Sequence, residues 1–266
     1  MPVISLLTDF GLKDGNVGVM KGVIWRICPQ AQIADLSHLI SPQNIAEAAL
    51  VLFRAMPYFP PFSVHVAVVD PGVGTARRPM AARIGDQYYV GPDNGTLTLC
   101  LARAERLGQA VMCIHLNKPQ YWLEDVSHVF HGRDIFAPVA GHLAAGVQLE
   151  ALGVSFSDPV LLPLPRPERT PLGWRGEIIH IDHFGNVSSN LRIEDLPNVL
   201  KHKEKVTVRV GGLEIHGLVN TFGDRQPGEA VALFGSTGNL LVCVVNGSAA
   251  ERLNLKIGDP LEILLP

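Results

Sequence analysis

The chain has 266 residues, of which 47% are hydrophobic and 18% are charged, and its formal net charge is −3. This length suits one large domain or two modest ones, and the charge balance gives no basic excess that would indicate nucleic acid as a partner. The sequence contains no apolar run of membrane-spanning length and no evident signal peptide. Its four cysteines are far apart and form no CxxC pair, which favours buried thiols in a reducing compartment. We therefore expect a cytoplasmic protein that contacts neither membrane nor nucleic acid.

In the first half of the chain, apolar runs alternate with amphipathic stretches. The expected strands are VISLLTDFG, AQIADLS, VHVAVVD, QYYVGPDNG and the segment around VMCIHL. Helices are expected in DGNVGVMKGVIWRICP, after an N-terminal cap at Ser41–Pro42, from Thr96 to Ala104, and in FHGRDIFAPVAGHLAAG. This alternation predicts an α/β domain with a mostly parallel sheet covered on both faces.

The composition changes after residue 158. Prolines cluster from Pro159 to Pro171, and this stretch contains the predicted linker, residues 164–171. The runs that follow are short, β-branched and separated by glycine turns, which is typical of a small antiparallel barrel. The sequence thus predicts an α/β domain over residues 1–163 and an all-β domain over residues 172–266.

Three of the expected strands end in an acid, at Asp9, Asp70 and Asp93. Taken singly, each is typical of a turn or a helix cap. Taken together, they would line one edge of the sheet, where open parallel sheets bind their ligands, and His131 could reach the same edge. Such a cluster could hold a divalent metal, but no close-set histidine and acid motif favours that choice. Arg133 and Asp134 are expected to pair with each other.

Other motifs narrow the chemistry. The PGVGT turn lacks both the GxGxxG fingerprint and the P-loop lysine, so it supports no dinucleotide or nucleoside triphosphate site. In IDHFGN, Phe184 lies beside Asn186, and Phe222 follows later in NTFGD. Aromatic faces beside an amide suit a flat heteroaromatic ring, although a core role for either phenylalanine stays open. The residues alone indicate a two-domain protein with an acidic cleft and leave the reaction open.

A resemblance to a known family indicates a specific reaction. The motifs TDFG, MKGV, VVDPGVGT, GPDNG, FHGRDIFAP, DHFGN and a late glycine-serine segment follow one another along nearly the whole chain. In this order they resemble the adenosine-forming S-adenosyl-L-methionine hydrolases, which are relatives of the fluorinase and chlorinase. The resemblance implies a Rossmann-like three-layer N-terminal domain, a C-terminal β-barrel and a homotrimer. It also implies an active site between the N-terminal domain of one subunit and the C-terminal domain of its neighbour.

The same resemblance implies roles for individual residues. The water-activating triad of the family falls on Asp70, Arg77 and His131, with no metal and no cofactor, since S-adenosylmethionine is the substrate. The halogenases have an uncharged residue at the position of Asp70, which favours hydrolysis here. Further implied contacts are Asp9 with the ribose, Asp182 with the methionine amino group, Phe184, Asn186 and Phe222 with adenine, and Ser236 with the methionine carboxylate.

The sequence departs from the family pattern in two places. Asn16 stands where the family has an aromatic residue, and we expect this change to affect packing alone. The STGNLLVCVVN segment around Ser236 is one residue longer than usual and lacks its acid. Two other functions stay open beside hydrolysis, namely halide transfer to the same substrate and non-catalytic binding of S-adenosylmethionine or adenosine.

Overall fold

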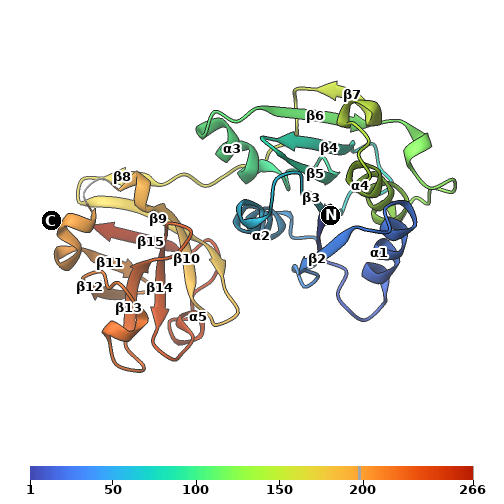
Figure 1. Ribbon diagram of the computed structural model, residues 1–266. Helices are drawn as coiled ribbons and strands as arrows, with labels where there is room; N and C mark the ends of the chain where they lie inside the picture. The colour runs from blue at the N-terminus through green and yellow to red at the C-terminus, as the bar shows by residue number, and fades with distance from the viewer. Residues whose placement is uncertain (197–198, 266) are drawn as a thin grey trace. The chain divides into compact units, whose positions relative to one another are not determined.

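The structure is a computed structural model that describes residues 1–196 and 199–265. It divides into two compact units, Met1–Leu162 and Pro163–Pro266, which are treated separately below. Figure 1 shows the first unit as a sheet with helices and the second as a strongly curved sheet. None of the helices in the described ranges is both long enough and apolar enough to cross a membrane.

The first unit is built on a seven-stranded sheet in the order β2-β1-β3-β5-β4-β6-β7. The β2-β1-β3-β5 part is parallel, and β4 and β7 each run antiparallel to their neighbours. The sheet is therefore mixed, and most of its strands share one direction. Its strands are β1 (Val3–Thr8), β2 (Gln32–Ser37), β3 (Val64–Val68), β4 (Pro79–Ile84), β5 (Gln87–Pro92), β6 (Val111–Leu116) and β7 (Gly153–Phe156).

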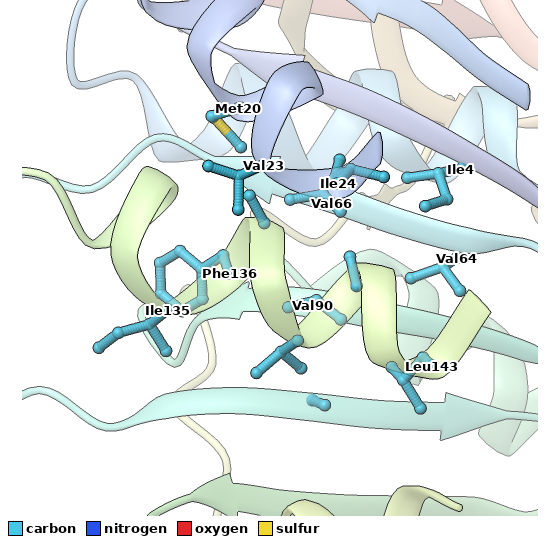
Figure 2. Packing of buried hydrophobic residues seen from close by; sticks show 14 of the residues in the cluster. Ile4, Met20, Val23, Ile24, Val64, Val66, Val90, Ile135, Phe136 and Leu143 are labelled. Carbon is cyan, nitrogen blue, oxygen red and sulfur yellow. The ribbon is translucent and has the colours of Figure 1, made fainter. Parts of the chain in front are cut away.

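Helices cover both faces of this sheet, because its central strands are apolar on both sides. On one face, Val64 and Val66 pack with residues of α1 and α4, and Figure 2 shows part of this cluster, including Ile24 and Leu143. On the other face, Leu7 and Ala67 pack with residues of α2 and α3. The helices are α1 (Asn16–Ile27), α2 (Ile45–Ala55), α3 (Thr98–Arg106) and α4 (Ala137–Ala144).

Three local expectations differ from the structure. The cap of α2 is Asn44, whose side chain accepts from the Glu47 N–H, and not Ser41–Pro42. The strand β4 is not among the expected strands, because Pro79, Ala81 and Ala82 are poor strand formers and Ile84 is its one β-branched residue. The FHGRDIFAP segment starts with a five-residue π-helical turn, Gly132–Phe136, before α4 begins. Such wide turns occur frequently at functional sites.

The second unit is an antiparallel, barrel-like sheet in the order β12-β11-β15-β9-β10-β14-β13, with β8 paired to β9. Inward-facing residues such as Val208, Val242 and Ile263 form its core. Its strands are β8 (Glu168–Thr170), β9 (Gly173–Ile181), β10 (Val187–Arg192), β11 (Thr207–Val210), β12 (Leu213–His216), β13 (Ala230–Phe234), β14 (Asn239–Val244) and β15 (Pro260–Leu264), with the short helix α5 at Ala249–Arg252. The strand β8 falls inside the predicted linker, residues 164–171.

Candidate active site

A cavity of about 440 Å³ opens at the carboxyl ends of β1 and β3. The position of the cavity follows from the sheet topology, because β1 and β3 are adjacent and parallel and therefore end at the same edge of the sheet. The residues that line it are Asp9, Phe10, Asn16, Gln43, Val68, Asp70, Pro71, Val73, Val129, Phe130, His131 and Gly132. Two predicted acids and the predicted histidine therefore share one cavity.

Asp70, Arg77 and His131 form a connected group beside this cavity. Arg77 Nε donates to Asp70 Oδ1 at 2.9 Å, and Arg77 Nη2 donates to Asp70 Oδ2. The same Nη2 donates to His131 Nδ1 at 2.8 Å. The side chains of Arg77 and Asp70 are only 9% and 5% exposed, so this ion pair is shielded from solvent. Arg77 thus holds the acid and the imidazole together.

The turn from Asp70 to Arg77, which we call the catalytic turn, depends on its glycines. A Cβ on Gly72 would lie 3.2 Å from Cγ of Arg77, so the bare glycine leaves room for that side chain. Gly74 has φ +75°, and a Cβ there would lie 2.2 Å from the carbonyl oxygen of His128. The turn therefore folds Arg77 back onto Asp70 and packs against the segment that leads to His131.

The contact with Arg77 determines which nitrogen of His131 carries the proton. A guanidinium has only donors, so His131 Nδ1 must accept, and the neutral ring carries its proton on Nε2. Burial lowers the pKa of His131, and the charge of Arg77 lowers it further. His131 is therefore held neutral, with an Nε2–H group as its remaining donor.

Asp9 is oriented by a strained neighbour. The backbone N–H of Gln43 donates to Asp9 Oδ2 at 2.8 Å, and Gln43 itself has φ +64°, which non-glycine residues rarely adopt. Strain of this kind is concentrated at functional sites. Asp9 is thereby directed into the cavity with acceptor capacity left for a ligand hydroxyl.

The prediction that Asp93 joins the other acids in an acidic cleft is wrong. Asp93 is 4% exposed and is absent from the cavity lining, and its Oδ2 accepts from Arg78 Nε at 2.8 Å. The two adjacent arginines thus serve different acids. The expected pairing of Arg133 with Asp134 is confirmed at 2.5 Å. Within the described ranges, no group of three or more His, Cys, Asp or Glu side chains could hold a metal ion.

In the second unit, Asp182, Phe184 and Asn186 lie together in the loop between β9 and β10. Asp182 Oδ1 accepts from the N–H groups of Phe184 and Asn186, and its Oδ2 accepts from Asn186 Nδ2. Gly185 has φ +79°, and a Cβ there would meet Ser248. This tight loop leaves the Phe184 side chain 74% exposed, which argues against a core role.

Phe222 and Ser236 lie at different ends of the barrel. Phe222 is 44% exposed and stands in the connection that leads to the start of β13. Because Ala230 of β13 faces Val244 at the end of β14, that connection is at the same end as the loop 182–186. Ser236 is in the turn between β13 and β14, at the opposite end. Within one chain, the structure therefore does not bring Ser236 together with the other predicted residues.

Two polar residues of the cavity lining, Gln43 and Asn16, were not predicted as site residues from the sequence. Gln43 carries no motif, since its role comes from its backbone conformation and its N–H group. Asn16, expected to affect packing alone, begins α1 and lines the cavity beside His131. Asn16 lies five residues after the TDFG motif, which follows a strand, and this position could have indicated that it is close to the site. A second cavity, of about 340 Å³, lies beside β12 in the second unit and contains none of the predicted residues.

Comparison with known proteins assigns the chain to a family. Residues 4–153 match the SAM hydroxide adenosyltransferase N-terminal domain, and residues 176–262 match the C-terminal domain of the same name. The chain belongs to the SAM hydroxide adenosyltransferase family. The family match covers both units, and it agrees with the resemblance carried by the sequence motifs.

Named relatives of the family are similar along their full length. An (R)-S-adenosyl-L-methionine hydrolase of Salinispora tropica is 42% identical, covering 98% of this chain and 97% of the relative. One of Thermus thermophilus is 40% identical, covering 99% and 100%. A fluorinase of Nocardia brasiliensis is more distant, at 27% identity over 98% and 96%.

Two solved structures share the fold. An uncharacterized conserved protein from Thermotoga maritima superposes with a TM-score of 0.90 at 40% identity, covering 98% of this chain and all of the other. A conserved hypothetical protein from Thermus thermophilus gives a TM-score of 0.78 at 39% identity, covering 99% and 100%.

Proposed function

We propose that this protein hydrolyses S-adenosyl-L-methionine to adenosine and L-methionine, with water attacking the ribose C5′ carbon. The observation that carries this proposal is the Asp70–Arg77–His131 group at the wall of the Asp9 cavity. The group combines a buried carboxylate, a neutral imidazole and the guanidinium that joins them, and Asp9 in the same cavity is suited to bind ribose hydroxyls. Family membership and the names of the full-length relatives support the same reaction.

The reaction needs a better nucleophile rather than a better leaving group. The water oxygen forms a bond to C5′ while the C5′–S bond breaks, and its electron pair returns to sulfur as the neutral thioether of methionine. Asp70 accepts the proton that the water loses, which leaves the new hydroxyl on adenosine. General-base assistance of this kind contributes ~10²–10⁴-fold. The sulfonium leaves without protonation, so no acid is required.

The other two residues of the group align this step. His131 presents Nε2–H, which can donate to the water and direct a lone pair of its oxygen toward C5′. Arg77 does not line the cavity, so it acts by holding Asp70 and His131 in fixed relative positions. Correct placement of a nucleophile can lower the barrier as much as proton transfer does.

The remaining contacts follow the family resemblance. Asp9 would bind the ribose hydroxyls, and Phe184, Asn186 and Phe222 would surround the adenine. Asp182 would meet the methionine amino group, while Ser236, at the opposite end of the barrel, is left out of this set of contacts. The exposure of both phenylalanines supports a role in binding, since an exposed aromatic face is free to stack on a ring. We further propose a homotrimer in which the second-unit residues come from a neighbouring subunit.

The names of the relatives suggest which form of the substrate is used. A sulfonium with three different carbon substituents is a stereocentre, and it inverts slowly to its R form. The Salinispora and Thermus relatives are named hydrolases of (R)-S-adenosyl-L-methionine. We propose the same preference here, because an enzyme that removes only the R form spares the S form that serves as methyl donor.

Two alternatives remain. Halide transfer is disfavoured because the Asp70 carboxylate lies at the cavity wall, where it would repel an incoming anion. A non-catalytic binder of S-adenosylmethionine or adenosine would not need the Arg77 link between acid and imidazole.

The decisive experiment is incubation of the purified protein with separated R and S epimers, with adenosine followed by chromatography. We expect adenosine from the R epimer, no 5′-chloroadenosine in chloride buffer, and no turnover by Asp70→Ala. Tight binding without turnover would instead establish a binder, and a chlorinated product would establish a halogenase. Light scattering tests the trimer, and a monomer that is fully active would refute the shared site.

A further inference from the structure

The GPDNG motif has no place in the reaction described above, although it lies next to the catalytic turn. Its two polar residues, Asp93 and Asn94, follow β5 directly. The strand β5 pairs with β3 on one side and with β4 on the other. The catalytic turn connects the same two strands, so Asp93 and Asn94 face both of its ends.

Asn94 holds the first end of the turn. Its Nδ2 donates to the carbonyl oxygen of Val69, the residue before Asp70, at 2.8 Å. The side chain is itself fixed, because Asn94 Oδ1 accepts from the hydroxyl of Thr96 at 2.8 Å and from the Thr96 N–H at 3.2 Å. The amide therefore has one orientation in which all of its partners are satisfied.

Asp93 holds the second end. Its N–H donates to the carbonyl of Arg78, the residue after Arg77, at 2.9 Å, and its Oδ2 accepts from Arg78 Nε at 2.8 Å. Asp93 Oδ1 accepts from the N–H of Val160, so both carboxylate oxygens are engaged. The Asp93 side chain is 2% exposed, so this ion pair is little weakened by solvent on the acid side.

The two ends of the turn are thus tied to consecutive residues of one strand end. We propose that Asp93 and Asn94 are positioning residues, a clamp that keeps the catalytic turn closed so that Arg77 reaches Asp70 and His131 together. This inference rests on the proposed function of that group. Neither residue lines the cavity, so the clamp acts through geometry and not through contact with substrate.

The clamp explains why the two arginines are not interchangeable. Arg78 is fixed to Asp93 and also donates to Asp158 Oδ1 at 2.8 Å. With Arg78 anchored, the preceding residue has little freedom, and Arg77 is directed to the other side of the chain, onto Asp70. Misplacement of a catalytic group by as little as ~1 Å can cost about 10²-fold in rate.

Two variants test the clamp. Asn94→Leu removes the bond to Val69 but keeps a side chain of the same branched shape, and Asp93→Asn removes the charge that faces Arg78. The matched control is Asn190→Leu, since Asn190 Nδ2 also donates to a backbone carbonyl, that of Pro165, at 3.0 Å, but in the second unit. We expect kcat to fall about 10²-fold in both clamp variants, with KM nearly unchanged, and no such fall in the control.

A second readout does not depend on turnover. His131 faces the charged or titratable groups Arg77, Asp70, Asp134 and His128, and Arg77 lowers its pKa. If the clamp opens and Arg77 moves away, the pKa of His131 rises, which ¹⁵N NMR of the imidazole measures directly. Loss of the Asp93 charge would by itself shift this pKa downward, so a rise in Asp93→Asn means that the site has opened, with Arg77 farther from His131 or the imidazole more exposed to solvent.

The outcomes are distinct. A raised His131 pKa in folded Asn94→Leu and Asp93→Asn, with the wild-type value in Asn190→Leu, supports the clamp. An unchanged pKa in both clamp variants overturns it, as does an unchanged kcat. A wild-type protein that forms no adenosine would refute the proposed function, while the NMR comparison would still decide whether the clamp positions Arg77.

Discussion

Replacement of Arg77 by lysine tests the central role that we propose for its guanidinium. Arg77 makes its contacts from two different nitrogens, with Nε on Asp70 Oδ1 at 2.9 Å and Nη2 shared between Asp70 Oδ2 and His131 Nδ1. A lysine ammonium keeps the positive charge but is a single point on a flexible stem. It can pair with Asp70 or with His131, and it cannot reproduce the planar fork that joins them.

The size of the effect follows from the contacts that are lost. Arg77→Lys removes at least one hydrogen bond of a charged group, which contributes ~1.5–3 kcal/mol where solvent is excluded. Arg77 is only 9% exposed, so little of this is lost to screening. If the loss falls on the transition state, ~1.36 kcal/mol per factor of ten gives a fall in kcat of about 10- to 150-fold. KM should change little, because Arg77 does not line the cavity.

Steady-state rates of adenosine formation from the R epimer measure both constants. Arg133→Lys is the matched control, since Arg133 also donates from Nε and Nη2 to one carboxylate, that of Asp134, but its side chain is 36% exposed. We expect that control to retain the wild-type kcat. If Arg77→Lys keeps the wild-type kcat as well, the guanidinium fork is not needed, and charge alone accounts for the role of Arg77.

Three further predictions concern other parts of the site. Because the pKa of His131 is lowered, its ring should stay neutral at pH values below the ordinary imidazole pKa of about 6.5. We therefore expect kcat/KM to fall to half of its maximum only below about pH 6.5. A fall that begins above that pH would contradict a neutral His131 in the active site. Asp9→Asn should raise KM by about tenfold or more in initial-rate measurements, and an unchanged KM would exclude Asp9 from ribose binding. Gly74→Ala should lower the free energy of unfolding by more than ~1 kcal/mol in urea titration, since its φ is +75° and a Cβ would strike the carbonyl of His128; wild-type stability would show that the turn can relax.

The part of the site that could be predicted from sequence depends on strand periodicity. Asp9 and Asp70 each follow a buried strand, and the β1–β3 pairing brings their ends together as expected. The same rule failed for Asp93. A strand end places a backbone position at the sheet edge, but the direction of the side chain depends on its partners. Arg78, fifteen residues earlier and outside any motif of its own, turns Asp93 away from the cavity.

Backbone-determined features were also beyond sequence reasoning. Gln43 contributes an N–H group from a left-handed conformation that no composition rule predicts for glutamine. The strand β4 has few residues of high strand propensity and runs antiparallel, so neither its composition nor the parallel pattern of its neighbours revealed it. The π-helical turn at Gly132–Phe136 likewise depends on packing, where a Cβ on Gly132 would lie 3.3 Å from Sδ of Met20 and 3.4 Å from Phe10.

The adjacent arginines show how a local sequence can carry two unrelated tasks. The side chains of these two neighbouring residues diverge and reach different carboxylates. Arg77 enters the catalytic group and Arg78 leaves it for Asp93. The bond of Arg78 to Asp93 also restrains Arg77, because it limits the backbone conformations available to the adjacent residue. If Asp70 and His131 act as proposed, their placement depends on Arg78, which lies outside the cavity lining, as well as on Arg77.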